Sequence, residues 1–88
     1  MNLKNKKILI TGATGGIGNS MVEKFNNLGA SIIATGTNEE KLNDLKKNYP
    51  NIIIEKFNLD DHDKIEKFIE NVTDKLNGLD ILVNNAGI

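Results

Sequence analysis

The residue types best suited to chemistry lie in a glycine-rich segment, Thr-Gly-Ala-Thr-Gly-Gly-Ile-Gly, at residues 11–18. It follows a short apolar run and precedes a helical pattern, so the first N–H groups of a helix should lie beside a tight turn. Such N–H groups bind phosphate, and glycine lets a pyrophosphate approach the main chain without meeting a Cβ atom. The segment therefore predicts a pyrophosphate site formed by Gly12, Ala13, Thr14, Gly15, Gly16, Ile17 and Gly18.

The spacing of these glycines fits two patterns. Gly12, Gly16 and Gly18 fit Thr-Gly-x-x-x-Gly-x-Gly, whereas Gly12, Gly15 and Gly18 fit Gly-x-x-Gly-x-x-Gly. The segment lacks the Gly-Lys-Ser/Thr of a Walker phosphate loop. The alternative interpretation is a strand-to-helix turn without a ligand, although four glycines in residues 12–18 would then cost backbone entropy for no return.

The end of the second predicted strand should indicate which dinucleotide binds. An acidic residue about twenty residues beyond the glycine turn would bond the ribose 2′-hydroxyl of NAD(H). The sequence has Thr-Gly-Thr-Asn at residues 35–38, and its first acid is Glu39. This favours NADP(H) without excluding NAD(H), and Thr37 and Lys41 are among the donors available to a 2′-phosphate. Thr37 also fits a helix capping box with Glu40, so a purely structural role stays open.

Polar or small residues also follow the third and fourth predicted strands. Asn58 and Leu59 are expected beside the adenine, although this segment also suits the start of a helix. In the last turn, the Asn85 amide can join neighbouring strands, and the small residues Ala86 and Gly87 would let the nicotinamide end of a cofactor come close. The one histidine, His62, has no second ligand nearby, so neither a catalytic nor a metal site is predicted.

The elements that must position these residues alternate along the chain. Short apolar runs predict strands over 7–11, 31–35, 51–57 and 79–83. Helical periodicity predicts helices over 17–28, 38–48 and 61–76. Because the strands are apolar on both faces and separated by helices, we expect an α/β fold with a doubly wound parallel sheet of strand order 3-2-1-4. Residues 1–88 would form one nucleotide-binding unit, the N-terminal half of such a sheet.

The composition excludes several other classes of function. The chain has 88 residues, a formal net charge of −1 and no cysteine, and its eleven basic residues are all lysine. This charge balance gives no reason to expect nucleic acid or an acidic membrane surface as a partner. No apolar stretch is long enough for a signal peptide or a membrane span, and a cytoplasmic protein is expected.

Together, these segments resemble the short-chain dehydrogenase/reductase family over the whole chain. The resemblance rests on residues 11–18, on Asn-Leu-Asp at 58–60 and on Leu-Asp-Ile-Leu-Val-Asn-Asn-Ala-Gly-Ile at 79–88. Within the family the chain is similar to bacterial 3-oxoacyl-(acyl-carrier-protein) reductases. The resemblance implies NADPH-dependent reduction of a keto substrate carried on acyl carrier protein, in a homotetramer. It also implies that Thr37 contacts the adenosine ribose or its phosphate and that Asn85 lies near the nicotinamide ribose.

The family's catalytic residues have no counterpart in this chain. Family chemistry uses a serine and a Tyr-x-x-x-Lys motif, in which the tyrosine donates a proton and the lysine lowers the pKa of that tyrosine. The single tyrosine, Tyr49, has Ile53 four residues later, and both serines, Ser20 and Ser31, belong to the first βαβ unit. We therefore predict no catalytic residue here. The alternatives to a reductase segment are a stand-alone nucleotide-binding module and an inactive truncated fragment.

Overall fold

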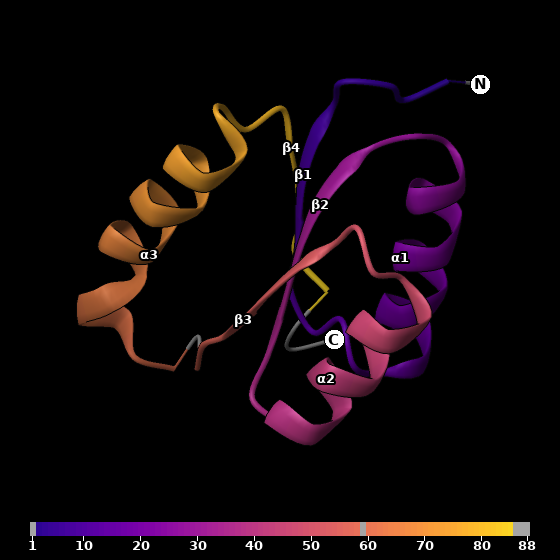
Figure 1. Cartoon of the computed structure of the whole chain (residues 1–88). Coiled ribbons are helices and arrows are strands. Elements are labelled where there is room, and N and C mark those ends of the chain that lie inside the picture. Colours follow the sequence, from indigo (N-terminus) through magenta and orange to yellow (C-terminus); the bar gives the residue numbers. More distant parts are fainter. Residues whose placement is uncertain (1, 59, 86–88) are drawn as a thin grey trace.

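The computed structural model describes residues 2–58 and 60–85 and shows three layers, with a parallel sheet between helices (Figure 1). The strands are β1 (Lys7–Ile10), β2 (Ser31–Gly36), β3 (Ile53–Lys56) and β4 (Ile81–Val83). The helices are α1 (Gly16–Asn27), α2 (Glu39–Asn48) and α3 (His62–Leu76). The sheet order is β3-β2-β1-β4 with every pair parallel, which confirms the predicted α/β fold and strand order.

The two faces of the sheet carry separate apolar clusters. Because side chains alternate along a strand, Ile8 and Ile10 of β1 join Val22 of α1 and Leu45 of α2 on one face. Leu9, between them, faces the other way. There it packs with the residues that α3 buries, which are Phe68, Val72 and Leu76. Figure 1 shows α1 and α2 on one side of the sheet and α3 on the other.

The apolar stripe predicted for the first helix is partly wrong. Met21 and Phe25 are half-buried as expected, whereas Ile17 is 59% exposed and Val22 is buried in its place. The reason is that α1 meets the chain at the end of β1 through Gly18, which is buried. That contact turns the side chain of residue 17 away from the sheet.

Strand β4 is also less covered than its sequence predicts. Its apolar residues Ile81 and Leu82 are 38% and 52% exposed. Helix α3 packs on Leu9 and Ile33 of the two central strands, and β4 lies at the edge of the described sheet beyond them. Apolar character on both faces therefore predicted the strand but not its burial. None of the helices that the structure describes is long and apolar enough to cross a membrane.

The start of α2 corrects the capping box predicted at Thr37. The helix begins at Glu39, and its N-cap is Asn38, whose side-chain Oδ1 accepts a hydrogen bond of 3.0 Å from the N–H of Lys41. A helix that starts one residue later than predicted moves the cap from the hydroxyl of Thr37 to the amide of Asn38. This leaves Thr37 exposed and without the role of N-cap.

We expect Asn38→Ala to lower the free energy of unfolding by about 1 kcal/mol, because it removes the acceptor for the Lys41 N–H. Thr37→Ala, the matched control, should stay within about 0.5 kcal/mol of the parent chain, as exposed substitutions usually do. Urea unfolding followed by far-ultraviolet circular dichroism measures both. Equal losses in the two variants would contradict the assignment of the cap to Asn38.

Candidate cofactor-binding site

The glycine-rich turn lies where β1 ends and is held by main-chain hydrogen bonds. Gly12 has a φ of 60°, in the left-handed region that favours glycine, and its carbonyl accepts from the N–H of Gly15 at 3.3 Å. The N–H of Ala13 donates to the carbonyl of Thr35 in β2 at 3.0 Å. These bonds fix the turn above the sheet edge and direct the chain into α1.

Two glycines of this turn differ in what surrounds them. A Cβ atom on Gly18 would lie 2.2 Å from the Gly12 carbonyl oxygen and 2.7 Å from the Ala13 Cα, so the fold itself requires glycine there. A Cβ atom on Gly16 would meet nothing within 4 Å. Gly18 therefore serves the packing of α1 on the turn, and the space beside Gly16 is open to a ligand.

The N-terminus of α1 is electrostatically unlike those of the other helices. Its N-cap, Gly15, makes no side-chain hydrogen bond, and its first turn holds no acidic residue. By contrast, α2 has the Asn38 cap followed by Glu39 and Glu40, and α3 has Asp63 in its first turn. The partial positive charge of an uncapped helix end favours an anion, so among the helices described this end is the one prepared for an external anion.

A polar network joins the end of β4 to the glycine turn. The hydroxyl of Thr11 contacts the Asn84 Oδ1 at 3.2 Å and the Val83 carbonyl at 3.3 Å, and it accepts from the Asn85 N–H at 2.9 Å. The Asn85 amide then donates to the Gly12 carbonyl at 3.1 Å. The network fixes Asn85 beside the turn, as predicted for an amide that joins neighbouring strands.

The ends of β2 and β3 complete the edge of the sheet. A Cβ atom on Gly36 would lie 3.3 Å from the Thr14 side chain, so the glycine turn and the end of β2 pack closely. The next residue, Thr37, is exposed. Beyond β3, Asn58 is exposed too, and its Oδ1 accepts from the N–H of Asp60 at 2.9 Å in a local turn.

The structure thus places most of the predicted residues on one edge. Residues 12–18, Thr37, Asn58 and Asn85 all lie just beyond the carboxyl ends of their strands. Leu59, Ala86 and Gly87 lie outside the described residues. His62 is exposed at the start of α3, and within residues 2–58 and 60–85 no three His, Cys, Asp or Glu side chains are grouped as for a metal ion.

Thr11 is the site residue that the sequence reasoning missed. It is 3% exposed and connects Asn84, Asn85 and Val83. The available signal was its position between the apolar run Ile8–Ile10 and Gly12. A hydroxyl at a buried strand end needs partners, and Asn84 and Asn85 at the end of the neighbouring strand supply them.

Comparison with known proteins shows the family to which the chain is similar. Residues 6–88 match the family model for short chain dehydrogenases. The whole chain aligns with 35% of the length of a 3-oxoacyl-(acyl-carrier-protein) reductase from Rickettsia conorii, at 44% sequence identity. It also aligns with 38% of the length of a 3alpha-hydroxysteroid dehydrogenase from Mediterraneibacter gnavus, at 40% identity.

Solved structures agree with the sequence comparison. A short chain dehydrogenase from Bacillus anthracis superposes on 96% of the chain with a TM-score of 0.86 and 35% identity, over 35% of its own length. A 2-keto-3-deoxy-D-gluconate dehydrogenase from Streptococcus agalactiae superposes on 99% of the chain with a TM-score of 0.88 and 32% identity, over 34% of its length. The chain therefore spans about 35% of the first curated relatives that it matches. On its sequence and its fold, the chain belongs to the short-chain dehydrogenase family.

Proposed function

We propose that this chain is the NADP(H)-binding part of a short-chain oxidoreductase. The observation that carries the proposal is the uncapped N-terminus of α1, with open space beside Gly16 and no acid in its first turn. A pyrophosphate fits these features for two reasons. The helix dipole stabilises its negative charge, and the lack of a side chain at Gly16 lets it approach the main-chain N–H groups. The cofactor, when bound, supplies the hydride for reduction of a carbonyl group.

Each part of the dinucleotide has residues suited to it. The residues proposed for the pyrophosphate are Gly12, Ala13, Thr14, Gly15, Gly16, Ile17 and Gly18. Thr37 would contact the adenosine ribose or its 2′-phosphate, and Asn58 and Leu59 the adenine. Asn85, Ala86 and Gly87 would border the nicotinamide ribose. The support for Asn85 is its hydrogen bond to Gly12, which holds it beside the pyrophosphate residues.

The substrate proposed for the whole protein is a keto group on a thioester of acyl carrier protein. The support is the repeated similarity to 3-oxoacyl-(acyl-carrier-protein) reductases, at 42% identity for the one from Rickettsia typhi and 39% for the one from Vibrio cholerae. Fatty acid synthesis, a cytoplasmic location and a homotetramer belong to the same proposal. The second candidate is a binding module without turnover.

The proposal predicts that the chain binds NADPH and that Gly16→Ala weakens binding at least tenfold. The added methyl group meets no protein atom, so it should occupy ligand space without loss of stability. A helix position changed from glycine to alanine should even gain about 0.5–1 kcal/mol. Calorimetric titration with NADPH, together with urea unfolding, measures both effects. Equal affinity in the parent and the variant would exclude a pyrophosphate at this turn.

The enzymatic part of the proposal has a separate test. The coding sequence downstream of Ile88 should encode a serine followed by Tyr-x-x-x-Lys if the chain belongs to a reductase. We expect residues 1–88 alone to bind NADPH and to leave it unoxidised when a 3-oxoacyl thioester is added. A stop codon directly after Ile88 would restrict the function to binding and favour the second candidate.

A further inference from the structure

The residues proposed for the pyrophosphate and the adenosine ribose, 12–18 and Thr37, include no cation for a 2′-phosphate. A phosphate monoester carries between one and two negative charges at neutral pH. The chain has no arginine, and neither the glycine turn nor Thr37 contributes a basic side chain. The first turn of α2 contributes two carboxylates, Glu39 and Glu40, which would repel the phosphate. Lys41 is the one basic residue of that turn, so a second cation, from another element, would strengthen a preference for NADP(H) over NAD(H).

We propose that Lys56, the last residue of β3, supplies this cation and so selects the 2′-phosphorylated dinucleotide. The inference rests on the proposed function, because it assigns a residue to the recognition of the cofactor proposed above. The cofactor preference would then depend on β3 as well as on β1 and β2, because Lys56 of β3 supplies the positive charge that distinguishes NADP(H) from NAD(H).

The register of the sheet brings Lys56 to the right position. Lys56 pairs with Gly36 across β2 and β3, and the N–H of Phe57 donates to the Gly36 carbonyl at 3.0 Å. Adjacent strands lie about 4.8 Å apart, so Lys56 begins one strand spacing from the residue that precedes Thr37. The ammonium group then has a flexible four-carbon stem with which to reach a phosphate at Thr37.

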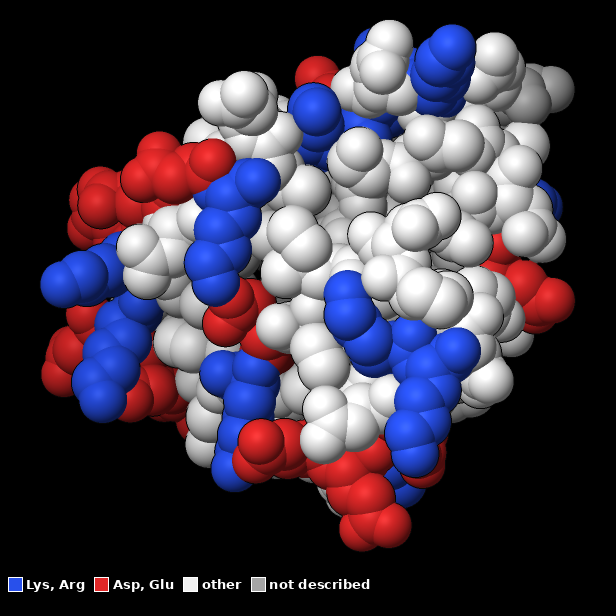
Figure 2. Space-filling view, viewed as in Figure 1, with Lys and Arg blue, Asp and Glu red and all other residues white. Residues whose placement is uncertain are grey.

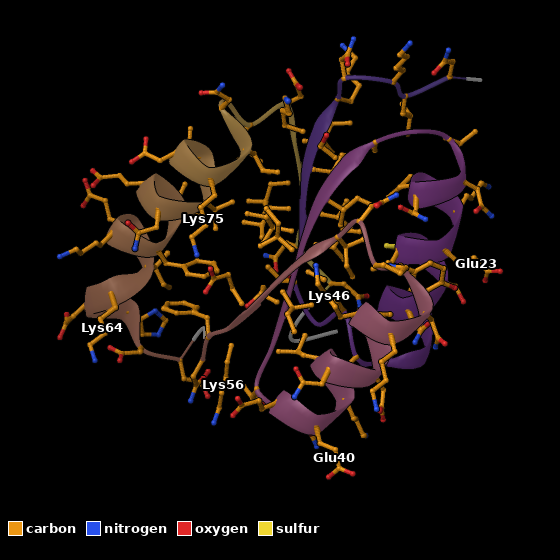
Figure 3. The ribbon with its side chains drawn as sticks, viewed as in Figure 1. Glu23, Glu40, Lys46, Lys56, Lys64 and Lys75 are labelled. Atoms are coloured by element: carbon orange, nitrogen blue, oxygen red, sulfur yellow. The ribbon has the colours of Figure 1, made fainter. Side chains whose placement is uncertain are left out.

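The alternation along β3 points Lys56 toward α2. Ile54 packs with the cluster shared by α1 and α2, whereas Glu55 reaches Lys75 of α3 on the opposite face. Lys56 follows Glu55 and so returns to the face of Ile54. Figure 3 shows Lys56 at the end of β3, on the side of the first turn of α2. This is the turn that follows Thr37.

The Lys56 ammonium group forms no ion pair or hydrogen bond with another group in the part of the chain that the structure describes. The ion pairs among the described residues join Lys64 to Asp61 and Lys75 to Glu55. Lys46, the labelled lysine of α2 in Figure 3, donates instead to the carbonyls of Pro50 and Ile52. Lys56 takes part in none of these contacts and is exposed. Its ammonium group is thus available to an external anion.

The charge distribution on the wider surface gives no long-range source of selectivity. Figure 2 shows basic and acidic side chains interspersed over the face in view, without a broad region of one sign. A mixed surface provides little long-range attraction for an anion, so recognition of a phosphate depends on charges that lie beside it. Lys41, on the first turn of α2, is the other nearby lysine and would add to the effect of Lys56.

The test compares the dissociation constants for NADPH and NADH in the chain and in Lys56→Gln. We expect the variant to bind NADPH about tenfold more weakly, the lower end of the range for a lost charge-assisted hydrogen bond, and to bind NADH within about twofold of the parent. Lys56→Arg should retain the preference for NADPH. Lys47→Gln is the matched control, because it removes the same charge from the last turn of α2, about 12 Å along the helix from Glu39, and should change neither constant.

The possible outcomes separate this inference from the proposed function. An unchanged ratio of the two constants in Lys56→Gln, or an equal change in Lys47→Gln, would overturn the role of Lys56 while leaving dinucleotide binding intact. A parent chain that binds NADH as tightly as NADPH would overturn it as well. A parent chain that binds neither dinucleotide would instead refute the proposed function, and the inference with it.

Discussion

Gly18→Ala is expected to destabilise the chain by about 3 kcal/mol, at the upper end of the range for overpacking. The alanine Cβ would lie 2.2 Å from the Gly12 carbonyl oxygen and 2.7 Å from the Ala13 Cα. Both of these atoms belong to the main chain, so no side chain can rotate to relieve the clash. The first turn of α1 would have to move away from the end of β1.

The consequence extends beyond stability, because the displaced helix end is the proposed anion site. Small domains have little stability to lose, and a change of this size would leave a substantial fraction of the chain unfolded. Urea unfolding should show a lower midpoint, and calorimetry a loss of NADPH binding in the remaining folded protein. Gly16→Ala is the control, since the same added methyl group meets no atom within 4 Å. If the two variants unfolded at the same urea concentration, the close packing at Gly18 would be wrong.

Most of the fold could be predicted because consecutive apolar residues mark the strands, whereas apolar residues at helical spacing mark the helices. Ile8, Leu9 and Ile10 are consecutive and apolar, which fits a strand buried on both faces, and the structure divides them between the two clusters. Helix α3 carries its apolar residues at helical spacing, and Phe68, Val72 and Leu76 are buried as expected. The right-handed crossover rule, together with the doubly wound arrangement of dinucleotide-binding sheets, then gives the observed strand order.

The errors arose where tertiary contacts decide between equivalent local signals. Thr37 and Asn38 are both good N-cap residues, and the sequence does not say on which one the helix begins. Ile17 fits the apolar stripe of α1, but the contact of Gly18 with Gly12 sets the rotation of the helix. Such choices depend on atoms from other elements, which a pattern along one segment does not contain.

The sequence predicts the candidate site as a set of strand ends, but it does not predict the hydrogen bonds and strand pairings that connect them. Gly12, Thr37, Asn58 and Asn85 were assigned from their positions after apolar runs, and the parallel sheet brings them to one edge. The bond from Asn85 to the Gly12 carbonyl depends on the register of β1 and β4, which sequence periodicity does not specify. The same holds for the pairing of Lys56 with Gly36.

Two buried threonines at adjacent strand ends should respond in opposite ways to the same substitution. Thr11→Val removes the hydroxyl that contacts Asn84 and Val83 and accepts from the N–H of Asn85. We expect a loss of about 2–3 kcal/mol, because a partly buried N–H and amide oxygen lose their partner while the shape of the side chain is preserved. The binding of NADPH should weaken as well, since Asn85 is no longer held beside the turn.

Thr35→Val, the matched variant, should instead raise the free energy of unfolding by about 1 kcal/mol. Thr35 is 1% exposed, and its Oγ1 has no hydrogen-bond partner among the described residues. Burial of an unsatisfied hydroxyl costs about 1–3 kcal/mol, and valine removes that cost at nearly constant volume. Urea unfolding of both variants measures the difference. Losses of similar size at the two positions would mean that the substitution disturbs packing in general, and the Thr11 network would then have no special part in joining β4 to the cofactor edge.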